Sequence, residues 1–426
     1  MSIEPRRAIF FAVALLAGLL AQFSVNVVGT LPLAEIVLLV FCGAVVVHTS
    51  VTRKLAAPFF REPLFLILVV AQTIAFGSYI VSDVCRGTST NDMIRGWSRM
   101  IFLGMDIVAF AYLFRAHASC FIWSTVGLML GGVLATAMGG AQYDAYWKFG
   151  FGGPATIATF LIIPFFGRAV GLALIAALSF LHLSLDYRST GGVCLIAAML
   201  LGVQMLPRQF RVLVLIPALV LGTALTFWMN DRQRFDDDAR GSRSTVERTA
   251  MMEAASEAFF ESPMIGQGSW FSNSPVMENF QLLRSMGARL AGVHGYAIET
   301  EETNIAIHSQ LLVSIAEGGI FGGTFFIVFG ALLAWALWYC TISRAPDSRT
   351  PIFVFTLLNA VWNLLFSPFS GAHRIGIALG CGLILLLWRE AGSRATAEGE
   401  EPEFENEEPA ELHEARFMTT STHMKP

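Results

Sequence analysis

Long apolar runs separated by short polar connections dominate this chain. A helix needs roughly 20 apolar residues to cross about 30 Å of hydrocarbon, so each such run is a candidate membrane helix. The runs lie near residues 8–28, 31–49, 63–82, 99–115, 119–138, 153–167, 168–186, 190–206, 211–229, 308–341, 351–368 and 373–388. This pattern predicts an all-α, polytopic membrane helix bundle with about twelve transmembrane helices.

The uneven distribution of the runs predicts how the chain is organised. Residues 1–7 form a short N-terminus, residues 8–229 carry helices 1–9, and residues 230–306 form one large polar loop. The run at 308–341 is too long for a single span, which predicts an interfacial helical turn that leads into helix 10. That turn and helices 10–12 occupy residues 307–388, and a tail follows over residues 389–426. No matched pair of interrupted helices is visible, which disfavours an inverted-repeat transporter.

Lysine and arginine indicate how the bundle is oriented, because positively charged connections stay in the cytoplasm. With a cytoplasmic N-terminus, the inner connections carry Arg6, Arg7, Arg53, Lys54, Arg61, Arg115, Arg168, Arg208, Arg211, Arg344, Arg349, Arg389 and Arg394. The short outer connections carry Arg86, Arg95, Arg99, Lys148, Arg188 and Arg374. We therefore expect both termini inside and an even number of crossings. The loop 230–306 and His308 are then outside.

Composition limits the classes of function. With 55% hydrophobic and 14% charged residues, the 426-residue chain is not an ordinary water-soluble globule. Its net charge of −4 owes much to nine glutamates after residue 394, in a stretch whose composition predicts a disordered acidic cytoplasmic tail. The loop 230–306 is net acidic too, so no nucleic-acid surface is expected. The six cysteines form no CxxC pair, and neither a zinc site nor a disulfide framework is indicated.

The first half of the loop has helical periodicity. Its apolar stripe consists of Val246, Ala250, Ala254 and Ala258. This stripe predicts an amphipathic helix on the outer membrane–water boundary. Ser244 and Glu247 have the spacing of a capping box, which puts Arg248 in the first turn. A phosphate bound there would meet both a guanidinium and the free N–H groups of a helix N-terminus.

His308 stands where the polar loop returns to the membrane, and an imidazole there can meet water and a lipid-borne substrate together. The segment His308-Ser309, nine residues, Gly319, two residues, Gly322 resembles the signature of bacterial O-antigen ligases, His-[Asn/Ser/Gln]-x9-Gly-x-x-[Gly/Thr/Tyr], at every specified position. The same superfamily includes O-antigen polymerases. Gly319 and Gly322, like their neighbours, are expected to serve close helix packing.

Two further segments carry the resemblance. The run from Arg248 to the sequence SPMIGQG is similar to the family's Arg…Pro-x-x-Gly-x-Gly element. The run Arg188-Ser189-Thr190-Gly191, which opens an apolar helix, resembles its Ser-Arg-Gly element with the flanking residues shifted. The resemblance covers about residues 150–390.

The resemblance implies a membrane glycosyltransferase of the GT-C type. Such an enzyme moves a glycan from a polyprenyl (undecaprenyl) diphosphate carrier to an acceptor at the periplasmic face of the bacterial inner membrane. The implied reaction is inverting and needs no metal and no cofactor. Arg188 and Arg248 would be catalytic residues that bind the departing diphosphate, because arginine presents a charged planar fork to phosphate. His308 would be the general base for the acceptor hydroxyl, a role worth about 10² to 10⁴ in rate.

Several alternatives stay open. The acceptor is lipid A-core in a ligase, which the complete His motif favours, or a second carrier-linked oligosaccharide in an O-antigen or exopolysaccharide polymerase. A polytopic transporter or lipid flippase, and a scaffold or sensor acting through the tail, belong to other classes. The site residues also have structural interpretations: His308 as a wetted helix end, Arg188 paired with Asp186, and Arg248 bonded to Glu247 or Glu253. Asp106, inside a predicted span, is expected to be paired within the bundle.

Overall fold

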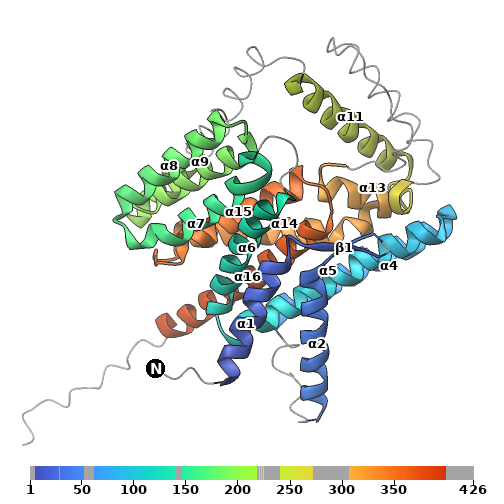
Figure 1. Ribbon diagram of the computed structural model, residues 1–426, viewed down its shortest axis with the longest axis horizontal. Coiled ribbons are helices and arrows are strands. Elements are labelled where there is room, and N and C mark those ends of the chain that lie inside the picture. Colours follow the sequence, from blue (N-terminus) through green and yellow to red (C-terminus); the bar gives the residue numbers. More distant parts are fainter. Residues whose placement is uncertain are drawn as a thin grey trace, which may run out of the picture. The chain divides into compact units, whose positions relative to one another are not determined.

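The computed structural model describes residues 5–27, 29–51, 62–140, 146–217, 240–271 and 307–399, together with residues 220, 222 and 224. It is mostly helical, as predicted (Figure 1). Six helices are long and apolar enough to cross a membrane: Pro63–Arg86, Thr90–Ala116, Ser119–Gly139, Trp147–Phe165, Thr324–Ser343 and Gly371–Arg394. These helices indicate a multi-pass membrane protein. The number twelve stays a prediction, because the other described apolar helices are 10–17 residues long.

The helices follow the predicted runs closely. The first eight runs correspond to α1 (Pro5–Leu20), α2 (Leu33–Val51), α4 (Pro63–Arg86), α5 (Thr90–Ala116), α6 (Ser119–Ala135), α7 (Gly152–Ile162), α8 (Arg168–Ser184) and α9 (Arg188–Val203). In the ninth run residues 211–217 are helical, and residues 225–229 lie outside the described residues. After them come α11 (Arg240–Glu261), α13 (Gln310–Gly322), α14 (Thr324–Trp338), α15 (Thr350–Phe366) and α16 (Gly371–Gly399). Short π- and 3₁₀-helical segments extend several ends: η1 (Thr136–Gly140), η2 (Trp147–Phe151), η3 (Ile163–Phe165), η4 (Ser269–Phe271) and η5 (Tyr339–Ser343).

The first predicted span is wrong at its C-terminal end. The run at 8–28 was expected to be one helix, but α1 ends at Leu20 and a hairpin follows, made of β1 (Ser24–Asn26) and β2 (Thr30–Pro32). The strands are antiparallel, with Val25 opposite Leu31. β-Branched valines favour a strand, and Gly29 adopts a φ of 109° that suits a tight turn. The all-α class therefore holds apart from this hairpin.

The long run at 308–341 divides as predicted into two helices. Gly319 interrupts the helical geometry of α13 with a φ of 68° and a ψ of −168°. After Gly323 the chain continues as the apolar α14. Glycine permits this left-handed backbone without a Cβ clash. The helical geometry is thus interrupted at Gly319, shortly before the longer apolar helix begins, and the interfacial position of the first helix stays a prediction.

The amphipathic helix of the loop is confirmed as α11, but its start was predicted wrongly. The helix begins at Arg240, so Ser244 lies inside it and cannot be its N-cap. Ala254 and Ala258 of the predicted stripe are fully buried. Arg248 follows two turns of helix, where backbone N–H groups are already bonded within the helix. The predicted combination of Arg248 with a helix N-terminus therefore fails.

The C-terminal helix also differs from its prediction. The last run was expected to end at residue 388 and the disordered tail to begin at 389, but α16 continues to Gly399. The added segment is rich in alanine, arginine and glutamate, which favour helix. The rest of the predicted tail lies outside the described residues.

Small residues set the closest helix packing in the described part of the chain. A Cβ on Gly127 of α6 would overlap the carbonyl oxygen of Leu15 in α1, and a Cβ on Gly18 of α1 would overlap that of Ser124. Gly131 meets the same helix one turn further on, at Leu19. These glycines let the two backbones touch, which is how membrane helices gain van der Waals contact without a hydrophobic driving force.

The connections between helices contact one another in two separate groups. Each group contains connections that the sequence prediction places on the same side of the membrane. We call the first group the His308 end; it comprises the α4–α5 turn, residues 262–271, the start of α13 and residues 366–374. The second group, the Asp347 end, joins the end of α9 to η5 and the start of α15. Which end faces the cytoplasm stays a prediction.

We expect Gly127→Ala to lower the thermal unfolding midpoint of the purified protein in detergent. The new Cβ must push α6 away from α1, and overpacking of this kind costs about 1–3 kcal/mol. Gly77→Ala in α4 is the matched control, because a Cβ there meets nothing within 4 Å. Its midpoint should stay or rise, since alanine favours helix over glycine by about 1 kcal/mol. Equal midpoints for the two variants would contradict the close α1–α6 packing.

Candidate functional site

His308 is held outside the first turn of α13. Ser309, the N-cap, has an extended backbone, and its Oγ accepts the N–H of Leu312 at 3.2 Å. The imidazole of His308 is half-buried, and its Nδ1 lies 3.1 Å from the sulfur of Met251 on α11. His373, at the start of α16, is close enough to interact electrostatically with it. Three elements distant in sequence therefore meet around this imidazole.

The segment after α11 is bound along α13 by main-chain hydrogen bonds. Ile320 N donates to Pro263 O at 2.8 Å, and Gln267 N donates to the carbonyl oxygen of Ala316 at 2.9 Å. Gly268 N donates to Glu317 O at 3.0 Å. The run SPMIGQG and the His308 motif, which the resemblance picks out separately, are therefore in direct contact.

The glycines in these two segments permit that contact. Gly266 and Gly268 both have a φ of 82°, a region that disfavours side chains. A Cβ on Gly319 would lie 2.5 Å from the carbonyl oxygen of Met264. Gly318 and Gly322 lie against the ring of Tyr79. The prediction of close helix packing is confirmed for Gly318 and Gly322, whereas Gly319 packs against the backbone of the loop that follows α11.

Below this contact lies a buried ion pair that the sequence analysis did not predict. Arg99 of α5 and Glu317 of α13 are 4% and 1% exposed and are joined by a hydrogen bond from guanidinium to carboxylate. Tyr79 Oη donates to Glu317 Oε2 at 2.8 Å, and Trp270 N donates to its Oε1 at 2.9 Å. The guanidinium also lies over the rings of Trp270 and Phe369, 4.8 and 4.9 Å from their centres. One charge pair thus connects α4, α5, α13 and η4.

Asp83 and Ser82 of α4 extend this network to the end of the glycine-rich segment. Asp83 accepts hydrogen bonds from Ser269 N at 2.6 Å, from Ser269 Oγ at 2.9 Å and from Trp97 Nε1 at 2.8 Å. Ser82 Oγ donates to Glu317 O at 2.7 Å and accepts from Gly268 N at 2.8 Å. The loop that follows α11 is therefore fixed to α4 as well as to α13.

A signal for this network was present in the sequence. Arg99 is one of the cations assigned to the short outer connections, and Glu317 follows His308 by nine residues. Each lies within an apolar run, at 99–115 and 308–341. A charge inside a membrane span usually pairs with another, so two such charges of opposite sign in different spans predict an ion pair. Only their spatial proximity could not be inferred.

Arg188 opens α9 as predicted, and it does pair with Asp186. Its Nε lies 3.0 Å from Asp186 Oδ1, and Lys148 Nζ lies 2.9 Å from Asp186 Oδ2. The N-cap residue of α9, Tyr187, makes no side-chain capping hydrogen bond. The combination of an arginine with a helix N-terminus, predicted at Arg248, is thus found at Arg188. This contact is the one expected if Arg188 has a purely structural role. The role of Arg188 in binding the diphosphate stays a prediction.

Buried hydrogen bonds hold the segment before Arg188. His182 Nδ1 accepts from Trp147 Nε1 at 3.0 Å, which places the imidazole proton on Nε2. Nε2 lies 2.8 Å from Thr156 Oγ1, and that hydroxyl donates to the carbonyl oxygen of Gly152 at 2.7 Å. The ring of Tyr187 packs edge-on against His182, and burial raises the pKa of Tyr187. These hydrogen bonds and the packing of Tyr187 therefore hold the backbone before Arg188 in place.

Arg248 lies on α11, the helix that His308 contacts. Met251, whose sulfur meets the imidazole, follows Arg248 by three residues. Residues three apart in a helix share a face. The side chain of Arg248 lies outside the described residues, so its pairing with Glu247 or Glu253 and its relation to Arg188 stay predictions. The structure brings together His308 and the helix that carries Arg248.

Gln310 and Asp106 are among the buried polar side chains that have no hydrogen-bond partner in the described part of the chain. Gln310, two residues after His308, is fully buried, and neither its amide oxygen nor its amide nitrogen is bonded. Asp106 was expected to be paired, yet neither of its carboxylate oxygens accepts a hydrogen bond. Its charged neighbours Glu35 and Arg374 are bonded to each other at 2.7 Å. Of the two, Gln310 lies next to the candidate general base.

We expect Arg99→Met to unfold at a markedly lower temperature than the wild type. Removal of one partner leaves Glu317 as an isolated buried charge, a change that costs about 3–5 kcal/mol. Arg115→Met is the matched control, because its ion pair with Glu62 is partly exposed (34% for Arg115), and exposed pairs are worth about 0–1 kcal/mol. The double variant Arg99→Met with Glu317→Met should recover part of the loss. If the two single losses simply add, the pair is not coupled.

Neither a search of protein-family models nor a search of curated proteins gave a match to this chain.

Proposed function

We propose that this protein is a membrane glycosyltransferase of the O-antigen ligase type, which moves a glycan from a polyprenyl diphosphate carrier to an acceptor hydroxyl. One observation carries the proposal: His308 lies at the contact between α11 and α13, where the two segments that resemble the family form one bonded unit. The half-buried imidazole is held by packing while part of it stays accessible. A general base needs both a defined position and access to its proton donor.

The contact of His308 with Met251 suggests which ring nitrogen acts. A thioether sulfur has no hydrogen to donate, so in the 3.1 Å contact Nδ1 is the donor. The lone pair of the neutral imidazole is then on Nε2. In the proposed step, the acceptor oxygen forms a bond to the sugar C1, the bond from C1 to the diphosphate oxygen breaks, and the acceptor proton moves to Nε2. The anomeric centre is inverted.

The diphosphate leaves with its electron pair, so cations must compensate a growing negative charge. Arg188 at the N-terminus of α9 and Arg248 on α11 are proposed for this role. Arg188 would exchange part of its contact with Asp186 for a phosphate oxygen, and the unbonded N–H groups of α9 would add to the attraction. These interactions strengthen as charge develops, which is the condition for accelerating the chemical step.

Gln310 is proposed to bind the acceptor sugar beside His308. A buried amide without partners is costly, and a sugar that offers both a donor and an acceptor, such as two adjacent hydroxyls, satisfies it. The amide would then hold the sugar while the neighbouring hydroxyl faces the imidazole. This contact would contribute to acceptor affinity more than to the chemical step.

We expect His308→Ala to abolish glycan transfer in proteoliposomes that contain a polyprenyl diphosphate glycan and an acceptor. Loss of the base should reduce the rate by about 10² to 10⁴. Arg188→Ala and Arg248→Ala should be similarly inactive, because each removes a cation from the leaving group. Transfer to lipid A-core indicates a ligase, and transfer to a second carrier-linked oligosaccharide indicates the polymerase.

His117→Ala is the control for that experiment, because His117 packs against Phe10 and Phe11 and takes no part in the proposed step. It should retain transfer. Full turnover by His308→Ala would remove the proposed base. Movement of the lipid-linked glycan across the bilayer without formation of a glycosidic bond would replace the proposal with a flippase.

We expect Gln310→Met to raise KM for the acceptor about tenfold while kcat changes little, since one or two hydrogen bonds to the substrate are lost. The methionine side chain has nearly the same length and removes a buried polar group that has no partner, so the unfolding temperature should stay or rise. A structural role would instead lower the unfolding temperature. An unchanged KM would show that the acceptor does not contact Gln310.

A further inference from the structure

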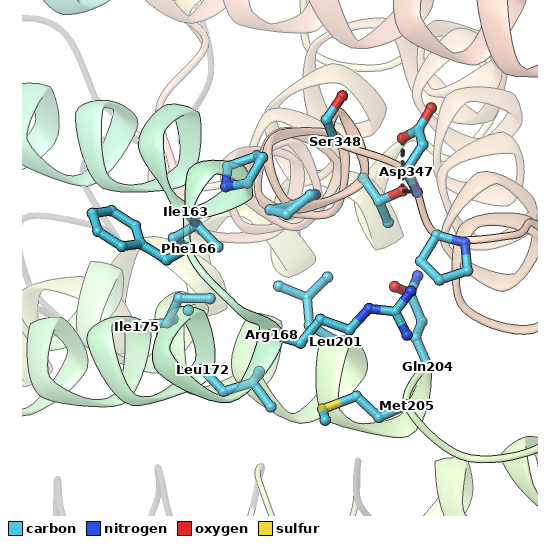
Figure 2. A pocket seen from close by; sticks show the side chains of 15 residues that line it. Ile163, Phe166, Arg168, Leu172, Ile175, Leu201, Gln204, Met205, Asp347 and Ser348 are labelled. Atoms are coloured by element: carbon cyan, nitrogen blue, oxygen red, sulfur yellow. Dashed lines mark hydrogen bonds between the residues drawn. The ribbon is translucent and has the colours of Figure 1, made fainter.

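A cavity of about 270 Å³ lies at the Asp347 end, between the α7–α8 connection, α9 and the start of α15 (Figure 2). Its wall is apolar along α8 and α9, where Leu172, Ile175 and Leu201 line it. At its other side Gln204 and Asp347 supply polar groups. The cavity is therefore amphipathic, and it is separate from the segments that surround His308.

One of the described residues that line this cavity is a cation, the exposed Arg168. Its guanidinium forms no hydrogen bond or ion pair with the other described residues. Figure 2 shows the guanidinium on the side of the cavity where Gln204 lies. Arg168 is also the first residue of α8, whose N-cap residue, Gly167, has no side chain to cap the helix. An anion in the cavity would be attracted by both the side chain and the helix end.

The nearby carboxylate cannot neutralise Arg168, because other residues already bind it. Asp347 accepts hydrogen bonds from Arg344 at 2.9 and 2.7 Å, from Arg349 and from Thr350. Burial raises the pKa of Asp347, but these contacts outweigh it and lower the pKa to about 2. Arg344 and Arg349 thus neutralise Asp347, and Arg168 adds a further positive charge to this group of residues.

Exposed aromatic residues continue the apolar wall outward. Phe165 is 85% exposed, and its neighbour Phe166 lines the cavity. In a multi-pass membrane protein, such aromatic side chains beside a connection lie at the level of the lipid headgroups. The ligand of the cavity is therefore expected to have an anionic head and an apolar tail.

We propose that this cavity binds an anionic phospholipid, with its phosphate at Arg168 and the start of an acyl chain along Leu172, Ile175 and Leu201. The volume suits a headgroup and a few methylene groups rather than a whole lipid. The apolar wall favours a lipid over a free phosphate ion, which would leave that wall empty. The proposal does not depend on the glycosyltransferase function.

The test is lipid retention by the full-length protein, purified in a neutral detergent and titrated with phosphatidylglycerol, phosphatidylcholine or inorganic phosphate under native mass spectrometry. We expect phosphatidylglycerol to bind at least about tenfold more tightly than phosphatidylcholine, and Arg168→Gln to remove this preference, since a charge-assisted hydrogen bond is lost. Arg208→Gln is the matched control, because this exposed arginine follows α9 and does not line the cavity. It should keep the preference.

Leu172→Trp fills the cavity without changing charge, and it should displace phosphatidylglycerol while the unfolding temperature is preserved. Equal binding of the two lipids by the wild type would overturn the proposal. Equal losses in Arg168→Gln and Arg208→Gln would also overturn it, because they indicate general attraction to positive charge. Inorganic phosphate that binds as tightly as phosphatidylglycerol would show an anion site without a lipid.

Discussion

Arg99 and Glu317 are opposite charges buried in a chain of membrane-compatible helices, and neither can stay buried alone. Taking an ion out of water costs several kcal/mol, and only a close partner with further hydrogen bonds offsets it. Here Tyr79 and the backbone N–H of Trp270 donate further hydrogen bonds to the Glu317 carboxylate, while aromatic rings cover the Arg99 guanidinium. Because the two charges come from α5 and α13, their pairing fixes the register between the first half of the chain and the helix that follows His308.

The position of the candidate base depends on this register. Glu317 is on the same helix as His308, and its main-chain oxygen also receives the N–H of Gly268. The loop after α11 is thereby bonded to α13, and α11 is brought against the imidazole through Met251. Left-handed glycines make the approach possible, since a side chain at Gly319 would collide with the loop backbone. A rigid support of this kind lets one end of a helix present an imidazole at a defined place.

Charged side chains have different environments at the two ends of the described bundle. At the His308 end, Arg99, Glu317 and Asp83 are bonded to protein groups and are hidden from solvent. At the Asp347 end, the carboxylate is saturated by two arginines, and the guanidinium of Arg168 lies in a partly apolar cavity. Paired charges hold helices together, whereas a cation placed against an apolar wall is suited to an amphiphilic ligand. We propose that the first arrangement supports the site around His308 and that the second binds a lipid.

The sequence by itself determined the helical class, most helix positions, the division of the run at 308–341, and the place of His308 and Arg188 at helix starts, because each follows from local hydropathy or a local motif. It misplaced the start of α11 and missed the hairpin after Leu20, since capping and strand signals are short and compete with the longer apolar pattern. Only the tertiary structure decided that Arg99 pairs with Glu317, that Gly319 meets Met264, and that Gln310 has no hydrogen-bond partner among the described residues. These contacts join residues from separate helices, and no local pattern specifies which helices pack together.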